Sequence, residues 1–121
     1  MDKEIGKCLI DIINCIKEID SYFLTNPKEL NTYQQNLMLR RAVERDLEII
    51  GEAVNRILKK QPDINISSAE KIVQFRNVVI HAYDTISDEL VWGVLMNHLP
   101  VLKKDALAIL KSNFPTYPVG E

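Results

Sequence analysis

The stretch RRAVERDLEIIGEAVNRI, residues 40–57, decides the fold. Its apolar residues recur every three or four positions and charged residues fill the positions between, which is the pattern of an amphipathic helix with one buried face. The pattern predicts one long helix from about residue 33 to residue 60, with Lys59 and Lys60 at the negative end of its dipole. The apolar stripe comprises Leu39, Val43, Leu47, Ile50, Val54 and Ile57.

A glycine lies inside this predicted helix, where it costs about 1 kcal/mol relative to alanine. Gly51 shares this stretch with two other small residues, Ala42 and Ala53. We expect these small side chains to let another helix approach closely. That helix could come from the same chain or from a partner chain.

The three- and four-residue spacing runs through most of the remaining chain, and no strand pattern competes with it. A first helix is expected to start at Asp2, a capping residue, and to end at the break in residues 25–31. Two further helices are expected over residues 69–83 and 88–112. Pro100 should kink the last of these by removing one backbone hydrogen bond.

Serines stand before both of the later helices. Ser67 or Ser68 can cap the first of them and Ser87 the second. We therefore predict an all-α protein, an antiparallel up-and-down bundle of four to five helices joined by short loops. Residues 1–112 are expected to form a single domain, followed by an irregular C-terminal tail over residues 113–121.

The composition describes a single domain with a substantial core: the chain has 121 residues, of which 46% are apolar. The formal net charge of -2 argues against a protein that binds nucleic acid through its overall charge. Any anion-binding surface must therefore be local, and the alternative is a solvated helix face with mixed ion pairs. All the arginines lie in the central part of the chain: Arg40, Arg41, Arg45, Arg56 and Arg76.

Several features favour a cytoplasmic protein without a cofactor. No apolar run approaches the roughly 20 residues that span a bilayer, and the N-terminus carries acids and lysines throughout. Cys8 and Cys15 lie two helical turns apart, about 10 Å, which is too far for a disulfide. They are expected to be buried apolar residues. Two cysteines and two histidines do not indicate a metal site, and no metal or other cofactor is expected.

A second stretch, FRNVVIHAYD at residues 75–84, combines residue types that suit phosphate chemistry. Arg76 offers a flat, charged fork that matches a phosphate, and His81 can exchange a proton near neutral pH. A proton acceptor beside a phosphate clamp is the minimal equipment for RNA cleavage. On one helix, however, these two side chains lie about 140° apart. They converge if the helix end loosens or if a second copy of the chain supplies the other set.

A purely structural interpretation is also open. A histidine near a helix C-terminus often only caps it, and Arg76 could pair with Glu70 or with an acid of the long helix.

Similar alternatives hold for other polar or aromatic residues. His98 is a surface residue at the kink or a cleft contact, and Trp92 is a core or dimer contact or an RNA-stacking platform. Asp84 and Asp88 follow the motif without an expected catalytic role. Arg40, Arg41 and Arg45 either extend an RNA path or pair with neighbouring acids.

The segment RNVVIHAY resembles the motif of the HEPN superfamily, in which an arginine and a polar residue precede a histidine. The tyrosine two residues later resembles the HepT-like toxins, here with Arg76, Asn77, His81 and Tyr83. The long helix is similar to the second helix of that family, with its ER, L and IGEA residues at positions 44–53. The resemblance covers roughly residues 3–112, so the predicted domain is HEPN-like.

The resemblance implies a homodimeric helical bundle that cleaves RNA, transfer RNA among the candidates, without a metal in a cleft at the dimer interface. It implies proton transfer by His81, phosphate binding by Arg76 and orientation by Asn77. The chain would then be the endoribonuclease toxin of a type II toxin–antitoxin pair. Its antitoxin, a minimal nucleotidyltransferase, would inactivate it by transferring AMP to Tyr83. The alternatives are a non-catalytic partner of such a nucleotidyltransferase, holding a nucleotide or substrate, and a purely structural bundle.

Overall fold

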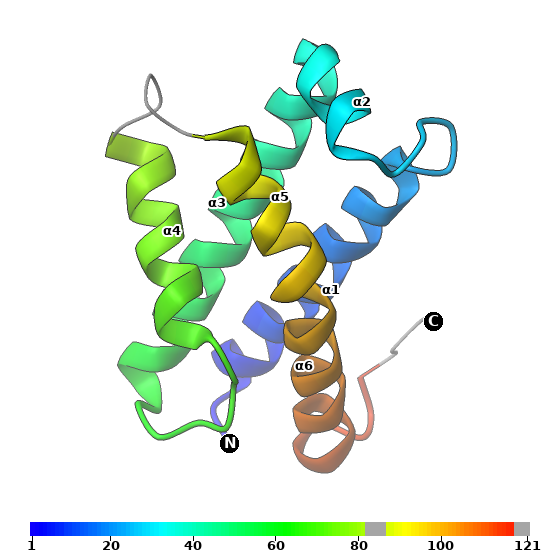
Figure 1. The fold of residues 1–121 in the computed structure, drawn as a ribbon. Coiled ribbons are helices and arrows are strands. Elements are labelled where there is room, and N and C mark those ends of the chain that lie inside the picture. Colours follow the sequence, from blue (N-terminus) through cyan, green and yellow to red (C-terminus); the bar gives the residue numbers. More distant parts are fainter. Residues whose placement is uncertain (82–86, 118–121) are drawn as a thin grey trace.

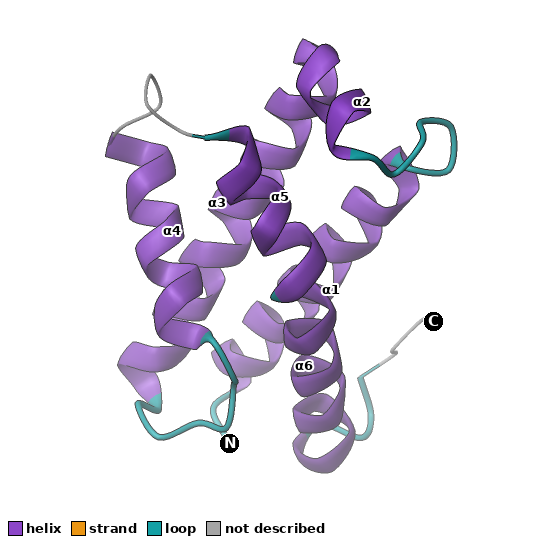
Figure 2. Cartoon of the chain, in the orientation of Figure 1, coloured by secondary structure: helices purple, strands orange, loops and turns teal. Residues whose placement is uncertain are grey.

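The computed structural model describes residues 1–81 and 87–117, without the side chains of residues 78–81. In these ranges every regular element is an α-helix, which confirms the all-α class (Figure 2). The up-and-down bundle, the dimer and the division between domain and tail stay predictions. The helices are α1 (Lys3–Tyr22), α2 (Leu30–Gln35), α3 (Leu37–Lys60), α4 (Ala69–His81), α5 (Asp88–Asn97) and α6 (Leu99–Asn113).

Two of the predicted helices are interrupted, so the described residues hold six helices where four to five were predicted. The helix expected from about residue 33 divides at Asn36, whose side chain accepts a hydrogen bond from the Leu39 amide at 3.0 Å and so caps α3. The last helix divides at His98, because Pro100 fits the first turn of a new helix better than a helix interior. A kink at Pro100 within one helix was predicted, and the structure has two separate helices there; the break at Asn36 was not predicted.

Side-chain caps fix two helix starts as predicted. Asp2 accepts a hydrogen bond from the Glu4 amide at 2.7 Å, and Ser87 accepts one from the Leu90 amide at 3.4 Å. At the start of α4, the Ser68 backbone oxygen accepts the first helical bond, and its hydroxyl lies 3.2 Å from Nδ1 of His98. These contacts define where α1, α4 and α5 begin.

The core forms where α1 packs against α3 and α6, and α3 packs in turn against α4 (Figure 1). The apolar stripe of α3 predicted from the sequence is buried throughout. Cys8 and Cys15 are free and buried, as expected. Burial, assisted by the nearby Asp46 carboxylate, raises the pKa of the Cys15 thiol to about 12.

Asp46 of α3 is the one buried charged side chain among the described residues, with 3% of its surface exposed. Its carboxylate accepts a hydrogen bond from the Tyr22 hydroxyl of α1 at 2.7 Å, and the same hydroxyl lies 2.8 Å from Oε1 of Glu18. Burial raises the pKa of Asp46, because the charged form loses water. This polar contact links α1 to α3.

The C-terminal segment continues to contact the helices beyond α6. Phe114 is buried, and its ring stacks on that of Tyr117 with a centroid distance of 5.1 Å. Both rings lie against Gly6 near the start of α1, where a Cβ atom would come 2.6 Å from Tyr117. In the part of the chain that the structure describes, no helix is long and apolar enough to cross a membrane.

Gly51 sets the distance between α3 and α4. A Cβ atom at this position would lie 2.3 Å from Cβ and 2.8 Å from Cγ of Arg76. Real carbon atoms do not approach so closely, so only glycine lets the stem of Arg76 lie against α3. The expected close helix approach is confirmed, and the approaching helix belongs to the same chain.

We predict opposite effects of alanine at two helical glycines. Gly51→Ala should lower the free energy of unfolding by about 1–3 kcal/mol, because the new methyl group overpacks against Arg76. Gly93→Ala is the matched control: a Cβ atom there meets nothing within 4 Å, so the variant should gain about 0.5–1 kcal/mol. Urea denaturation of both variants measures this. Equal stabilisation by the two alanines would contradict the close packing.

Candidate functional site: an arginine held at the edge of a charged groove

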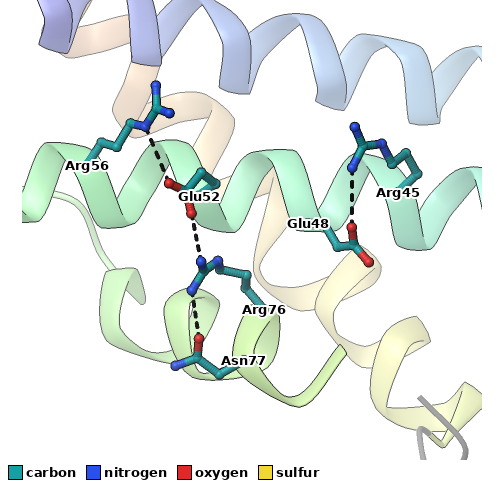
Figure 3. Close-up of polar contacts among 6 residues, drawn as sticks. All are labelled: Arg45, Glu48, Glu52, Arg56, Arg76 and Asn77. Atoms are coloured by element: carbon teal, nitrogen blue, oxygen red, sulfur yellow. Dashed lines mark hydrogen bonds and ion pairs between the residues drawn. The ribbon is translucent and has the colours of Figure 1, made fainter. Parts of the chain in front are cut away.

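Arg76 is positioned by three contacts. Its stem lies on Gly51, its Nη2 lies 2.7 Å from Oε2 of Glu52, and its Nη1 lies 2.7 Å from Oδ1 of Asn77 (Figure 3). The side chain is 21% exposed, and its Nε is buried without a hydrogen-bond partner among the described residues. An ion pair with an acid of the long helix was one of the structural alternatives, and it is present.

Glu52 is shared between two arginines. Its Oε2 pairs with Arg76, while its Oε1 lies 3.4 Å from Nε of Arg56 one turn further along α3. Toward the start of α3, Arg45 and Glu48 form a second pair at 3.4 Å (Figure 3). The spacing of these α3 residues places all of them on one face of the helix.

These side chains line a groove of about 370 Å³ between α1, α3 and α4. Three arginines face three carboxylates, so the local charge is balanced rather than strongly positive. Apolar side chains complete the wall. The lining residues are Cys8, Asp11, Arg45, Glu48, Ile49, Glu52, Ala53, Arg56 and Arg76.

The remaining motif residues lie at or beyond the limit of the described chain. The backbone of His81 ends α4, but its side chain is not described, and Tyr83 and Asp84 lie outside the described residues. Five residues of helix separate Arg76 from His81, a rise of about 7.5 Å. Because α4 runs back along α3 (Figure 1), this rise leads from Gly51 toward the part of α3 that carries Glu48.

The three arginines suggested as an RNA path have different positions. Arg45 lines the groove, whereas Arg40 points to Asp88 of α5, with Nη1 3.7 Å from its carboxylate. Arg41 is exposed and does not line the groove. Arg56 was not singled out from the sequence. The signal was available, because it follows Glu52 by four residues and shares a helix face with Arg45.

The other residues with open interpretations take structural positions. His98 contacts Ser68 and lines a separate pocket of about 360 Å³ with Phe75 and other side chains, away from Arg76. Trp92 packs edge-to-face on Phe23 with ring centroids 5.7 Å apart, which supports the core interpretation. Within the described ranges, no three His, Cys, Asp or Glu side chains gather as metal ligands would.

An all-helical chain that presents a fixed arginine five residues before a histidine at a helix end fits the HEPN-type proteins that its motif resembles. The family described as "Ribonuclease HepT-like" matches residues 12–109, and the chain belongs to this family.

Curated relatives agree with this family. "Putative RNase MJ0127" of Methanocaldococcus jannaschii is 28% identical over 113 residues, covering 90% of this chain and 89% of the relative. "Putative RNase MJ1380" of the same organism is 31% identical over 107 residues, covering 85% and 94%. "Putative RNase TTE0752" of Caldanaerobacter subterraneus is 33% identical over 75 residues, covering 61% and 67%. No solved structure matches the chain.

We predict a measurable coupling between Glu52 and Arg76. A double-mutant cycle with Glu52→Gln and Arg76→Gln should give about 0.5–2 kcal/mol, because the pair is partly buried and its contact is short and charge-assisted. The matched control pair is Asp20 and Lys103, 4.0 Å apart and more exposed, with an expected coupling near zero. Urea unfolding of the single and double variants provides the energies. A Glu52–Arg76 coupling no larger than the control would show that Glu52 does not hold the guanidinium.

Proposed function

We propose that this protein is a metal-independent endoribonuclease, the toxin of a type II toxin–antitoxin pair. The observation that carries the proposal is the guanidinium of Arg76, held by Glu52 and Asn77 at the edge of a groove and five residues before His81 on the same helix. Membership of the HepT-like ribonuclease family supports the reaction class. The proposed substrate is RNA in the cytoplasm, with transfer RNA among the candidates.

The proposed reaction needs only these side chains. Neutral His81 takes the proton of a ribose 2′-hydroxyl, and the resulting oxygen attacks the adjacent phosphorus. The bond to the 5′-oxygen breaks, that oxygen takes up a proton from water, and the imidazolium of His81 returns its proton to the solvent. The products are a 2′,3′-cyclic phosphate and a 5′-hydroxyl. Arg76 stabilises the negative charge that develops on the phosphorus oxygens. Asn77 orients the phosphate.

The proposed active unit is a homodimer of up-and-down helical bundles. Arg76 and His81 lie about 140° apart around α4, so one helix does not easily aim both at the same phosphate. Two copies of α4 at a shared cleft remove this difficulty, because the arginine of one protomer can act with the histidine of its partner. The cleavage site is therefore placed at the dimer interface.

The proposed regulation is AMP transfer to Tyr83 by a minimal nucleotidyltransferase antitoxin. The tyrosine follows His81 by two residues and so belongs to the same segment of chain. An adenylate group there would add negative charge and bulk to the cleft that is proposed to bind the RNA phosphate. RNA is then repelled and occluded.

The proposed function predicts that the protein cleaves RNA in the presence of excess EDTA. Protein expressed without a nucleotidyltransferase should cut transfer or total RNA, and His81→Ala should lose at least about 100-fold in rate, because proton transfer contributes that much or more. His98→Ala is the matched control, since His98 lies by Ser68 and away from the groove, and it should retain activity. The rate of product formation on denaturing gels measures this.

Equal cleavage by the wild type and His81→Ala would show a contaminating nuclease. No cleavage by any folded protein would favour the alternative of a non-catalytic partner that holds a nucleotide or substrate for a nucleotidyltransferase.

The proposed regulation predicts adenylation of Tyr83. After incubation with the cognate nucleotidyltransferase and ATP, mass spectrometry should find adenylate on the peptide that contains Tyr83, and RNA cleavage should fall at least about tenfold because the cleft is blocked. Tyr83→Phe should remain active under the same treatment. Tyr117→Phe, a change in the C-terminal segment, is the control and should be modified and inactivated like the wild type. Adenylate on a different residue would refute this assignment.

A further inference from the structure

The groove beside Arg76 has an unusual composition for a surface that meets RNA. It carries the carboxylates of Asp11, Glu48 and Glu52 as well as three arginines. A groove that only followed the RNA backbone would be lined by cations, since each phosphate is negative. Carboxylates that are not fully engaged by the arginines can accept hydrogen bonds from a part of the RNA that offers donors. In RNA those donors are the base N–H groups and the ribose hydroxyls.

The wall of the groove suits a flat base. Buried Cys8 and Ala53, together with Ile49, provide apolar surface between the charged side chains. Burial raises the pKa of the Cys8 thiol, so it stays neutral at physiological pH. The volume of about 370 Å³ lies within the range of small-molecule sites. A single nucleotide base with its phosphate is an occupant of suitable size and chemistry.

We propose that this groove is a base-recognition subsite for a nucleotide next to the cleaved phosphate, that Glu48 selects guanine there, and that Arg45 binds the neighbouring phosphate. The proposal rests on the proposed ribonuclease function, because Arg76 defines where the cleaved phosphate lies.

Two groove carboxylates have free acceptor positions: Asp11, which makes no hydrogen bond or ion pair among the described residues, and Glu48, which lies beside Arg45. Both oxygens of Glu52 face arginines, at 2.7 Å and 3.4 Å. Glu48 has one longer contact, 3.4 Å to Arg45, whose side chain is 72% exposed. An ionised carboxylate offers about four acceptor positions, so Glu48 can accept further bonds. Arg45 can turn to a phosphate at little cost, because exposed pairs of this kind contribute little.

Guanine fits a carboxylate better than the other bases. Its Watson–Crick edge carries N1–H and the N2 amino group side by side, and two parallel bonds to one carboxylate can form. Adenine and cytosine each offer a single amino group. Uracil offers one N–H flanked by two carbonyl oxygens, which an anionic carboxylate repels. A good bidentate pair discriminates by roughly 5- to 150-fold.

Binding of uncleavable RNA tests the subsite. The probes are fluorescent 2′-O-methyl pentanucleotides UUGUU, UUAUU, UUCUU and UUUUU, whose blocked hydroxyl prevents the reaction. Fluorescence anisotropy should show the wild type binding UUGUU about tenfold more tightly than UUUUU. Glu48→Gln should lose most of this preference. Asp20→Asn, a carboxylate of α1 outside the groove, is the control and should keep it.

A second variant separates base from phosphate. Arg45→Gln should weaken binding of all four probes by a similar factor and leave the order of the bases unchanged. A wild type without guanine preference, or a folded Glu48→Gln that keeps it, overturns the proposal. If Glu48→Gln does not fold, Arg45→Gln decides: a change in base order with equal overall affinity also overturns it.

Cleavage of ordinary RNA, assayed in parallel, keeps the two failures apart. RNA that is cut without guanine preference in binding leaves the ribonuclease function standing and removes the subsite. Guanine preference without cleavage supports the subsite as a binding site and removes the catalytic function. If the protein shows neither guanine preference nor RNA cleavage, both the subsite and the ribonuclease function are refuted.

Discussion

The contact between Gly51 of α3 and Arg76 of α4 is the constraint on which the site depends. Without a side chain at Gly51, the stem of Arg76 lies directly on α3, and its guanidinium reaches the carboxylate of the next residue, Glu52, at 2.7 Å. The same short distance that packs the two helices also orients the charged group. A core contact and the position of the candidate functional arginine are therefore one feature of the structure, and neither can change alone.

The charges around Arg76 follow from this packing. Glu52 neutralises one arginine and shares its second oxygen with Arg56, so an alternating row of charges forms along α3. The row explains how a chain with formal net charge -2 can present arginines locally without a strongly positive surface. Attraction of RNA by long-range charge is weak under these conditions, so the proposed RNA substrate would have to be recognised by short-range contacts.

The sequence predicted much of this arrangement, because helical periodicity and small residues are local signals. The stripe of α3 and the close approach at Gly51 were both correct. The break at Asn36 was missed, since one asparagine within a helical pattern does not by itself indicate that its side chain caps the next helix. The pairing of Arg76 with Glu52 rather than Glu70 depends on the distance between two helices, which no spacing along the chain encodes. The pairing of Arg56 with Glu52 was also missed, although its spacing of four residues along α3 was visible in the sequence.

For the proposed ribonuclease, the shared carboxylate gives Arg76 a specific advantage. An arginine that had to find its orientation during the reaction would lose side-chain freedom at that moment, whereas Glu52 and Asn77 fix it beforehand. Glu52 alone would also repel the phosphate, but Arg56 beside it offsets that charge. The guanidinium retains further N–H donors for the phosphorus oxygens, whose negative charge increases as the 2′-oxygen attacks. Its attraction is therefore larger in the transition state than in the bound RNA, which is the condition for accelerating the reaction.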